Sequence, residues 1–222
     1  MQKGKRQHIR FENLTNDRLK EAAALAADAF AVSPAYYFIL PHDADERRRF
    51  LVWLFERNFW LHLGTKCCRC TYEGDKLVAF FMFVLPGDAK PSLLDLVRAG
   101  LLGGLCRFGI AVVQRLWATK SWFEAKKHEV FGNRRVISLE RMTVLPSHQG
   151  RGVGTQALGK ALEEADELGM PVVLATQERI NVKFYSRLGF QVVDETRVDQ
   201  LGGYTNWMMM REPRVSRTSN SD

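Results

Sequence analysis

The chain has 222 residues, of which 46% are hydrophobic and 26% charged. This length suits one large domain or two small ones, and the composition excludes a chain that is disordered throughout. The formal net charge of +7 favours an anionic partner, but nucleic acid, an anionic membrane and a phosphate-bearing cofactor all meet that condition.

Cysteine usage and the apolar segments exclude further classes. The four cysteines, three of them at positions 67, 68 and 70, lack the spacing of a disulfide framework or a zinc site, so we expect free thiols and no metal. The most apolar stretch, Leu93 to Trp117, is interrupted by charged residues such as Asp95 and Arg98, which excludes a membrane span. No signal-peptide pattern is visible, so we expect a cytoplasmic protein with no membrane partner.

The first half of the chain predicts a strand, two helices, a hairpin and a helical segment. These elements are, in order, a strand at His8 to Leu14, an amphipathic helix up to Phe30, a helix from about Asp43 to Leu63, hairpin strands at Cys67 to Glu73 and Lys76 to Leu85, and helical stretches at about Ser92 to Trp117 and Ser121 to Val130. Pro34 and Pro41 interrupt the chain between the first two helices.

The second half alternates strands and helices. Its predicted elements are a strand at Arg135 to Leu145, a helix from Val153 to Leu168, a strand at Pro171 to Ala175, a helix marked by Ile180, Phe184 and Leu188, and strands at Phe190 to Thr196 and Thr205 to Arg211. The pattern predicts an α/β (α+β) fold: a mixed central sheet of about seven strands, helices on both faces, and a helical insertion (about 87–130) between the third and fourth strands. We expect one domain over residues 1–213 and a disordered tail at 214–222.

A glycine-rich turn, Gln149-Gly150-Arg151-Gly152-Val153-Gly154, joins the long strand to the next helix. This order places the free N–H groups of a helix N-terminus at the end of a sheet, where they can bind an anion. The glycines let the backbone approach phosphate oxygens closely, and Arg151 adds a positive charge. The sequence therefore predicts an anion site at this turn.

Three other interpretations of the turn are weaker. A dinucleotide-binding motif would place its last glycine at Thr155 or, in a tolerated variant, at Ala157, and no acidic ribose ligand follows the next strand. A P-loop match at Gly154 to Lys160 has Ala161 where a magnesium-binding Ser or Thr is required, and it lies inside a predicted helix. A turn that is glycine-rich only for tight packing stays open as an alternative.

The turn and its surroundings resemble the GNAT superfamily of N-acetyltransferases. The turn has the Gln/Arg-x-x-Gly-x-Gly/Ala form of that family's pyrophosphate loop, and Leu139 to Pro146 is similar to the strand that precedes it. Asn181 to Phe190 resembles the family's later helix and strand, with their Phe-Tyr and Gly-Phe pairs. The resemblance implies the GNAT fold and an acyltransferase that uses acetyl-CoA as its co-substrate.

The insertion and the C-terminal segment Trp207 to Pro213 resemble a narrower subgroup, which includes puromycin N-acetyltransferase. That subgroup commonly has Leu-Glu-Thr-Ser on the strand after the loop helix, where this chain has Leu174-Ala175-Thr176-Gln177. The difference removes a carboxylate near the acceptor side and weighs against a puromycin-like substrate.

The resemblance also implies which residues hold the cofactor. The strand backbone near Met142 and Val144 would pair with the pantetheine arm, as an extended peptide adds to a strand edge. Asn181 either contacts the cofactor or caps its own helix. Backbone N–H groups would hold the coenzyme A pyrophosphate at Gln149, Gly150, Arg151, Gly152, Val153 and Gly154.

Tyr185 is the expected general acid. It lies four residues after Asn181 on the same helical face, and the resemblance implies that its phenol protonates the coenzyme A thiolate as it leaves. A phenol of pKa ~10 is similar in basicity to such a thiolate. The alternative, which periodicity alone favours, is a core aromatic residue beside Phe184.

Glu140 is the candidate general base. An acceptor amine arrives protonated, and a partly buried carboxylate on the strand before the loop can take its proton directly or through a water. Strand alternation places Glu140 on the face it shares with Ser138 and Met142. A salt bridge to an arginine is the alternative role. His148 is expected at the surface, with no part in catalysis.

Three functions compete on these observations. The first is transfer of an acetyl group to the primary amine of a small molecule, by direct attack in a ternary complex. The second is acetylation of protein lysines or N-termini, which needs an open groove that the insertion would wall off. The third is a non-catalytic nucleic-acid or regulatory module, indicated by basic clusters at 47–49 and 126–127 but by no nucleic-acid motif. We expect a small-molecule amine acceptor, no nucleic-acid partner, and a monomer or homodimer.

Overall fold

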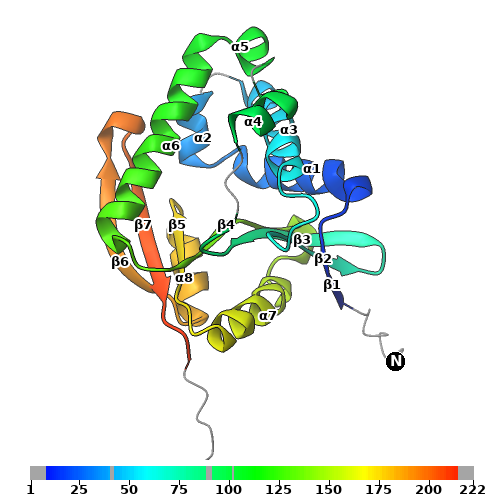
Figure 1. The fold of residues 1–222 in the computed structure, drawn as a ribbon, viewed down its shortest axis with the longest axis vertical. Helices are drawn as coiled ribbons and strands as arrows, with labels where there is room; N and C mark the ends of the chain where they lie inside the picture. The colour runs from blue at the N-terminus through cyan, green and yellow to red at the C-terminus, as the bar shows by residue number, and fades with distance from the viewer. Residues whose placement is uncertain (1–8, 41–42, 89–91, 102, 215–222) are drawn as a thin grey trace, which may run out of the picture.

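A seven-stranded mixed sheet forms the centre of the molecule (Figure 1). The computed structural model describes residues 9–40, 43–88, 92–101 and 103–214. The strand order is β1-β2-β3-β4-β5-β7-β6, and every neighbouring pair is antiparallel except β4 and β5. The strands are β1 (Ile9–Asn13), β2 (Cys68–Glu73), β3 (Lys76–Val84), β4 (Ile137–Val144), β5 (Val172–Thr176), β6 (Gln191–Val198) and β7 (Tyr204–Arg211).

Helices cover both faces of the sheet (Figure 1). On one face lie α1 (Leu19–Phe30), α2 (Pro34–Ile39), α3 (Ala44–Trp60), α4 (Leu93–Arg98), α5 (Gly103–Phe108) and α6 (Ile110–Phe131). The other face carries α7 (Val153–Glu167) and α8 (Arg179–Arg187). Single turns of 3-10 helix connect some elements, at Asn16–Arg18, Pro146–His148 and Asp199–Leu201.

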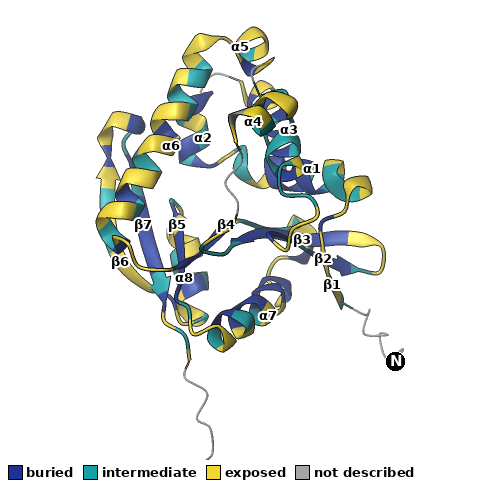
Figure 2. Cartoon of the chain, viewed as in Figure 1, coloured by how far each residue is buried: buried dark blue, intermediate teal, exposed yellow. Residues whose placement is uncertain are grey.

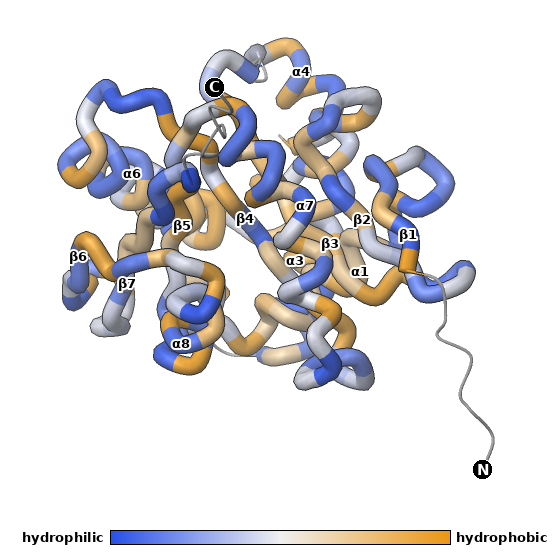
Figure 3. The backbone as a smooth tube through the Cα atoms, turned by 90° about the horizontal axis from the view of Figure 1, so that it is seen from below, coloured by the Kyte–Doolittle hydropathy of each residue, from blue (hydrophilic) through white to orange (hydrophobic). Residues whose placement is uncertain are grey.

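Strand β3 explains how the two faces are filled. Its residues are almost all buried, because alternate side chains enter two different cores. Phe80 and Met82 pack with α1 and α3, whereas Phe81 and Phe83 pack towards α7. Burial is concentrated in the central strands and the inner helix faces, and the outer surface of α6 is largely exposed (Figure 2). The view from below shows apolar residues gathered along the centre of the sheet (Figure 3).

The predicted fold class is confirmed. The sheet is mixed, has seven strands and carries helices on both faces, and the helical insertion lies between β3 and β4, the third and fourth strands. The domain boundary at residue 213 stays a prediction, and the predicted tail falls mostly on residues 215–222, outside the described part of the chain. Among the described residues, no helix is both long and apolar enough to cross a membrane.

Two features of the first half differ from the prediction. The chain is interrupted before Pro34, as expected, because α1 ends at Phe30, but an unpredicted helix, α2, begins at Pro34, since proline is well accommodated at the first position of a helix. Pro41 lies outside the described residues. The insertion does not break between Trp117 and Ser121, since α6 continues through both. Its earlier helices end at Arg98 and Phe108, and Gly109, with a φ of 79°, separates the second of them from α6.

Candidate active site

Strands β4 and β5 separate soon after they meet. They pair in parallel only at Ile137 with Val172 and at Ser138 with Val173. Beyond this point β5 continues along β7, and the edge of β4 that faces β5 has no strand partner in the described chain. Backbone N–H and C=O groups at such an edge can bind an extended amide-bearing chain. The opening therefore begins after Ser138 and leads to the glycine-rich turn.

A β-bulge lies in β4 beside this opening. Phe80 pairs with Thr143 and Met82 with Glu140, so two residues of β4, Arg141 and Met142, lie opposite one residue of β3. Arg141 has a φ of 52°, the only positive φ among non-glycine residues in the described chain. Bulges of this kind bend a strand and redirect its side chains. This bend accompanies the separation of β4 from β5.

The bulge corrects the predicted orientation of the β4 side chains. Strict alternation placed Glu140 and Met142 on one face, but the extra residue reverses the phase. Met142 packs towards α7, whereas Glu140 pairs with Met82 on the α1–α3 side. The Glu140 carboxylate contacts the Arg141 guanidinium at 2.7 Å, and 44% of its side chain is exposed. The structure therefore contains the salt bridge to an arginine that is the alternative role of Glu140.

The glycine-rich turn begins α7 as the sequence predicts. Gly150 and Gly152 have φ values of 71° and 80°, a region that side chains disfavour, and Gly152 is the N-cap residue. The first N–H groups of α7, at Val153 and Gly154, have no partner inside the helix and point out of its N-terminus. The Gln149 amide donates back to the Val144 carbonyl at 3.0 Å, which ties the turn to the end of β4. An anion at this turn would meet free donors and the positive end of a helix dipole.

His148 is a buried residue that contacts both the turn and β2, whereas the sequence predicts it at the surface. It is buried, with 6% of its surface exposed. One ring nitrogen lies 2.9 Å from the Ser147 hydroxyl and the other 2.8 Å from the Glu73 carboxylate. Glu73 also lies 3.6 Å from the Arg151 guanidinium, so this acid at the end of β2 fixes the turn at two points. The side chain of Arg151 is otherwise exposed and free to turn towards an anion.

Gly154 lets three elements converge at the start of α7. A Cβ at this position would lie 3.2 Å from the ring of Phe184 on α8, 3.3 Å from Val144 and 3.5 Å from Met142 on β4. Val153, beside it, is a buried core residue, so its contribution to an anion site is its backbone N–H. The third glycine of the motif therefore has a packing role that positions β4, α7 and α8 against one another.

We expect Gly154→Ala to weaken acetyl-CoA binding and to destabilise the fold by about 1 kcal/mol, because the added methyl group displaces Val144 and Phe184. Gly159→Ala is the matched control, since its Cβ meets nothing within 4 Å. Removing a glycine from the interior of α7 should stabilise the protein by about 0.5–1 kcal/mol. Thermal unfolding and calorimetric titration with acetyl-CoA measure both effects, and equal behaviour of the two variants would contradict the packing role of Gly154.

Helix α8 carries the two residues predicted to act at the cofactor. Asn181 donates to the Thr176 hydroxyl at the end of β5, over 3.3 Å, and does not cap its own helix, whose N-cap residue is Glu178. Tyr185 is 8% exposed and packs between Phe184 and Phe190. Burial raises the pKa of the Tyr185 phenol above its ordinary value, so it stays protonated at neutral pH. Both the acid and the core-aromatic roles are compatible with this placement.

A polar group lies where β5 ends and β7 begins, on the side covered by α6. The Gln177 amide donates to Asn206 Oδ1 at 2.9 Å. Asn206 is fully buried, and its Nδ2 has no hydrogen-bond partner in the described part of the chain. Lys127 of α6 contacts the Ser138 hydroxyl at the point where β4 and β5 begin to separate. These side chains lie on the face of the sheet opposite α7 and α8.

Sequence reasoning missed Arg141, Glu73 and Thr176. Arginine is an unusual residue at a positive φ, so nothing in the pattern of β4 indicated a bulge there. Glu73 acts through His148, which is 75 positions away, and Thr176 through a side-chain contact with Asn181 across the turn between β5 and α8, so periodicity reveals neither. In the described residues, no group of three or more His, Cys, Asp or Glu is arranged to hold a metal ion.

Comparison with known proteins agrees with this geometry. A family model described as the acetyltransferase (GNAT) family matches residues 28–190. An uncharacterised N-acetyltransferase of Methanocaldococcus jannaschii is 34% identical over 61 residues, which are 26% of this chain and 27% of that protein. The chain thus matches only about a quarter of that relative's length.

Solved structures share the fold at low identity. A histone acetyltransferase HPA2 and related acetyltransferase from Corynebacterium glutamicum superposes with a TM-score of 0.62 at 14% identity, covering 95% of this chain and 99% of its own. Arylalkylamine N-acetyltransferase 2 from Aedes aegypti gives a TM-score of 0.62 at 14% identity, covering 93% and 100%. A putative acetyltransferase from Salmonella typhimurium, solved with acetyl-CoA, gives 0.52 at 14% identity, covering 96% and 99%.

The separated parallel strands, the bulge and the glycine-rich helix start define a protein of the acyl-CoA-binding α/β class. The chain belongs to the acetyltransferase (GNAT) family, a family of acyltransferases. Acetyl-CoA is the ligand of the Salmonella typhimurium structure, and the residues present in this chain fit that molecule. The unpaired edge of β4 suits the amides of a pantetheine arm, and the N-terminus of α7 suits a pyrophosphate.

Proposed function

We propose that this protein transfers the acetyl group of acetyl-CoA to the primary amine of a small molecule, in a ternary complex. The observation that supports this most directly is the opening between β4 and β5, which leads to the glycine-rich start of α7. Such an opening accommodates an extended thioester-bearing arm, with its carbonyl near the bulge at Arg141 and its pyrophosphate at Gly150 to Gly154.

Each step of the reaction is assigned to a residue of this chain. Acetyl-CoA supplies a thioester, whose carbonyl carbon forms a bond with the amine nitrogen while its bond to sulfur breaks. Glu140, on the acceptor side of β4, takes a proton from the amine directly or through a water. Tyr185 donates its phenolic proton to the departing sulfur, and Asn181 with the turn residues holds the cofactor. Burial makes the Tyr185 phenol a weaker acid than an exposed phenol. The same exclusion of water makes the departing thiolate a stronger base.

The covering of the acceptor side favours a small molecule over a protein. Trp122 and Phe123 of α6 pack with Tyr204 of β7, and Arg115 of α6 reaches the Ile39 carbonyl at the end of α2. These contacts hold α6 over the face of the sheet on which an acceptor would enter, and a helix there favours a small acceptor over a peptide, which needs an open groove. The relatives include both kinds of enzyme, an arylalkylamine N-acetyltransferase and a ribosomal-protein-S18-alanine N-acetyltransferase. Protein acetylation is therefore the alternative.

Two narrower assignments concern the subgroup and the location of the protein. The likeness to the puromycin N-acetyltransferase subgroup is carried by the insertion and the last strand, and Ala175, which stands where that subgroup has a carboxylate, weakens it. A cytoplasmic location is favoured by the free thiols of Cys67, Cys68 and Cys70, which suit a reducing compartment. We propose this location together with the absence of nucleic-acid and membrane partners.

Calorimetric titration and an amine screen test the proposal. We expect tight binding of acetyl-CoA and, with a suitable small primary amine, release of one free thiol per acetylated product. Peptides with free N-termini or lysines serve as the competing arm of the screen. Lack of acetyl-CoA binding would refute the proposal, and turnover with peptides alone would replace it with protein acetylation.

A further inference from the structure

A second candidate site lies between α3 and α5, on the outer side of α3. Arg49 and Glu56 are on the face of α3 opposite Leu51, which is buried in the core. The acetyl-CoA opening is on the far side of that core, between β4 and β5 (Figure 1). The cavity has a volume of about 290 Å³ and is lined by Arg48, Arg49, Val52, Trp53, Glu56, Arg57 and Arg107.

Positive charge is in clear excess in this cavity. Four of the seven lining residues are arginines, and Glu56 is the single acid among them. Only Arg48 has an ion pair, with Asp28 on α1. Across the described chain, no carboxylate lies within 4.0 Å of the guanidinium groups of Arg49, Arg57 or Arg107. Like charges that share a cavity repel one another, and an anion in their midst would relieve that repulsion.

Arg57 is held in place by apolar and backbone contacts instead of an acid. Its guanidinium lies 4.5 Å from the centre of the Trp53 ring and donates to the Trp53 carbonyl at 3.1 Å. Its Nε is buried and has no hydrogen-bond partner in the described residues. Burial lowers the pKa of the Arg57 guanidinium below its ordinary value; Glu56 opposes this effect and Arg107 adds to it. The fold thus positions a guanidinium beside another cation without neutralising it.

The two helices around the cavity are firmly packed against each other. Phe108 at the end of α5 contacts Phe50 and Trp53 of α3, with ring centres 5.0 and 5.3 Å apart. Gly104 of α5 lies so close to the Trp53 indole that a Cβ would come within 2.8 Å of it. This packing fixes the backbone of α3 relative to that of α5, and the Trp53 contacts also hold the Arg57 side chain, whereas the Arg49 and Arg107 side chains are exposed. Part of the site is therefore formed before any ligand arrives, which lowers the cost of binding one.

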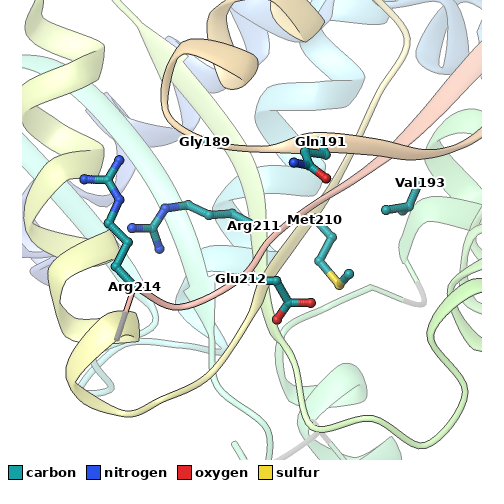
Figure 4. A pocket seen from close by; sticks show the side chains of 7 residues that line it. All are labelled: Gly189, Gln191, Val193, Met210, Arg211, Glu212 and Arg214. Atoms are coloured by element: carbon teal, nitrogen blue, oxygen red, sulfur yellow. The ribbon is translucent and has the colours of Figure 1, made fainter. Parts of the chain in front are cut away.

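A second cavity of comparable size, whose lining side chains are drawn in Figure 4, has charged residues that are mostly paired. It has about 250 Å³ and lies beside the end of β7. Its Arg211 makes a bidentate pair with Asp166, both contacts at 2.7 Å, and its Glu212 is paired with Arg134. Its cations are largely compensated within the fold. The excess charge at α3 and α5 is therefore not a general property of cavities in this basic protein.

We propose that the cavity between α3 and α5 binds the phosphate group of a small-molecule ligand, at a site separate from the acetyl-CoA opening. Guanidinium groups form paired, charge-assisted hydrogen bonds with phosphate oxygens, and three unpaired arginines from two helices offer donors from several directions. A volume of about 290 Å³ suits a small phosphorylated metabolite better than a nucleotide. The ligand would bridge α3 to α5 and so secure the insertion.

Inorganic pyrophosphate is the probe, titrated by calorimetry into protein saturated with acetyl-CoA, so that the turn at α7 is already occupied. We expect the wild-type protein to bind pyrophosphate and Arg107→Gln to bind it about tenfold more weakly. Arg214→Gln is the matched control, because it removes the same charge from an exposed arginine in the compensated cavity. It should bind pyrophosphate as the wild type does.

Both variants should bind acetyl-CoA normally, which separates this test from that of the acetyltransferase activity. The proposal fails if acetyl-CoA-saturated wild-type protein does not bind pyrophosphate, or if Arg107→Gln and Arg214→Gln weaken binding equally. Sedimentation with vesicles of phosphatidic acid and of phosphatidylcholine distinguishes a lipid headgroup from a free phosphate. Arg107-dependent binding to phosphatidic acid vesicles without binding of free pyrophosphate would overturn the proposal in favour of a membrane surface.

Discussion

Replacing Tyr185 with Phe should lower kcat by about 10²–10⁴-fold and leave acetyl-CoA binding nearly unchanged. The aromatic ring, which packs between Phe184 and Phe190, is retained, so the fold and the position of α8 should persist. Only the phenolic proton is lost, and with it the group that protonates the departing thiolate. Thiol release under steady-state conditions measures kcat, and calorimetric titration measures cofactor affinity.

Tyr72→Phe supplies the control for this experiment. Tyr72 is also a buried tyrosine, but it lies on β2 beside β1, remote from the opening. Its hydroxyl can be removed without touching the cofactor side, so kcat should stay within about twofold of the wild type. Unchanged turnover in Tyr185→Phe would leave Tyr185 as a core aromatic residue. A fall in acetyl-CoA affinity without a fall in kcat would assign it to binding.

Replacing Glu140 with Gln should lower kcat/KM by about 10²-fold at pH 7, because the protonated amine then has no carboxylate to deprotonate it. The loss should shrink as pH rises. An alkylamine has a pKa of ~10, so below this value each rise of one pH unit makes the free amine about tenfold more abundant. The variant should therefore gain about tenfold per pH unit between pH 7 and 9, whereas the wild-type profile should be flatter.

Glu140 also pairs with Arg141, so the structural effect of the substitution must be distinguished from its chemical effect. Glu140→Asp keeps the carboxylate and should keep a larger share of activity than Glu140→Gln at pH 7. Glu195→Gln, at an exposed position on β6, controls for the loss of one negative charge. Equal pH profiles for wild type and Glu140→Gln would show that the pair with Arg141 is the whole role of Glu140.

The fold was predictable because its signals are local. The apolar residues of α7 recur at helical spacing, the β2–β3 hairpin has turn residues between two strand patterns, and Gly152 begins a helix that follows a strand. The failures were also local. The pattern does not reveal α2, because Pro34 at its start is the same residue type that interrupts a helix interior.

The site was predictable only where a motif covers it. The turn at Gly150 to Gly154 lies where the sequence places it, whereas His148 beside it is buried against an acid 75 positions away. The bulge at Arg141 depends on pairing between β3 and β4, and it reversed the inferred face of Met142. The contact of Asn206 on β7 with Gln177 after β5 joins residues 29 positions apart, and no sequence spacing encodes it.

The short pairing of β4 with β5 should affect how the two parts of the sheet exchange their amide hydrogens. Among the described residues, β4 and β5 pair at only two positions, and α7 packs against strands on both sides of this junction. The sheet therefore consists of two blocks, β1–β4 and β5–β7–β6, with little backbone pairing between them. In hydrogen exchange, the amides of β5 and β7 should open independently of those in β2 and β3. A pantetheine arm lying between the blocks would join them, so cofactor binding should slow exchange in both.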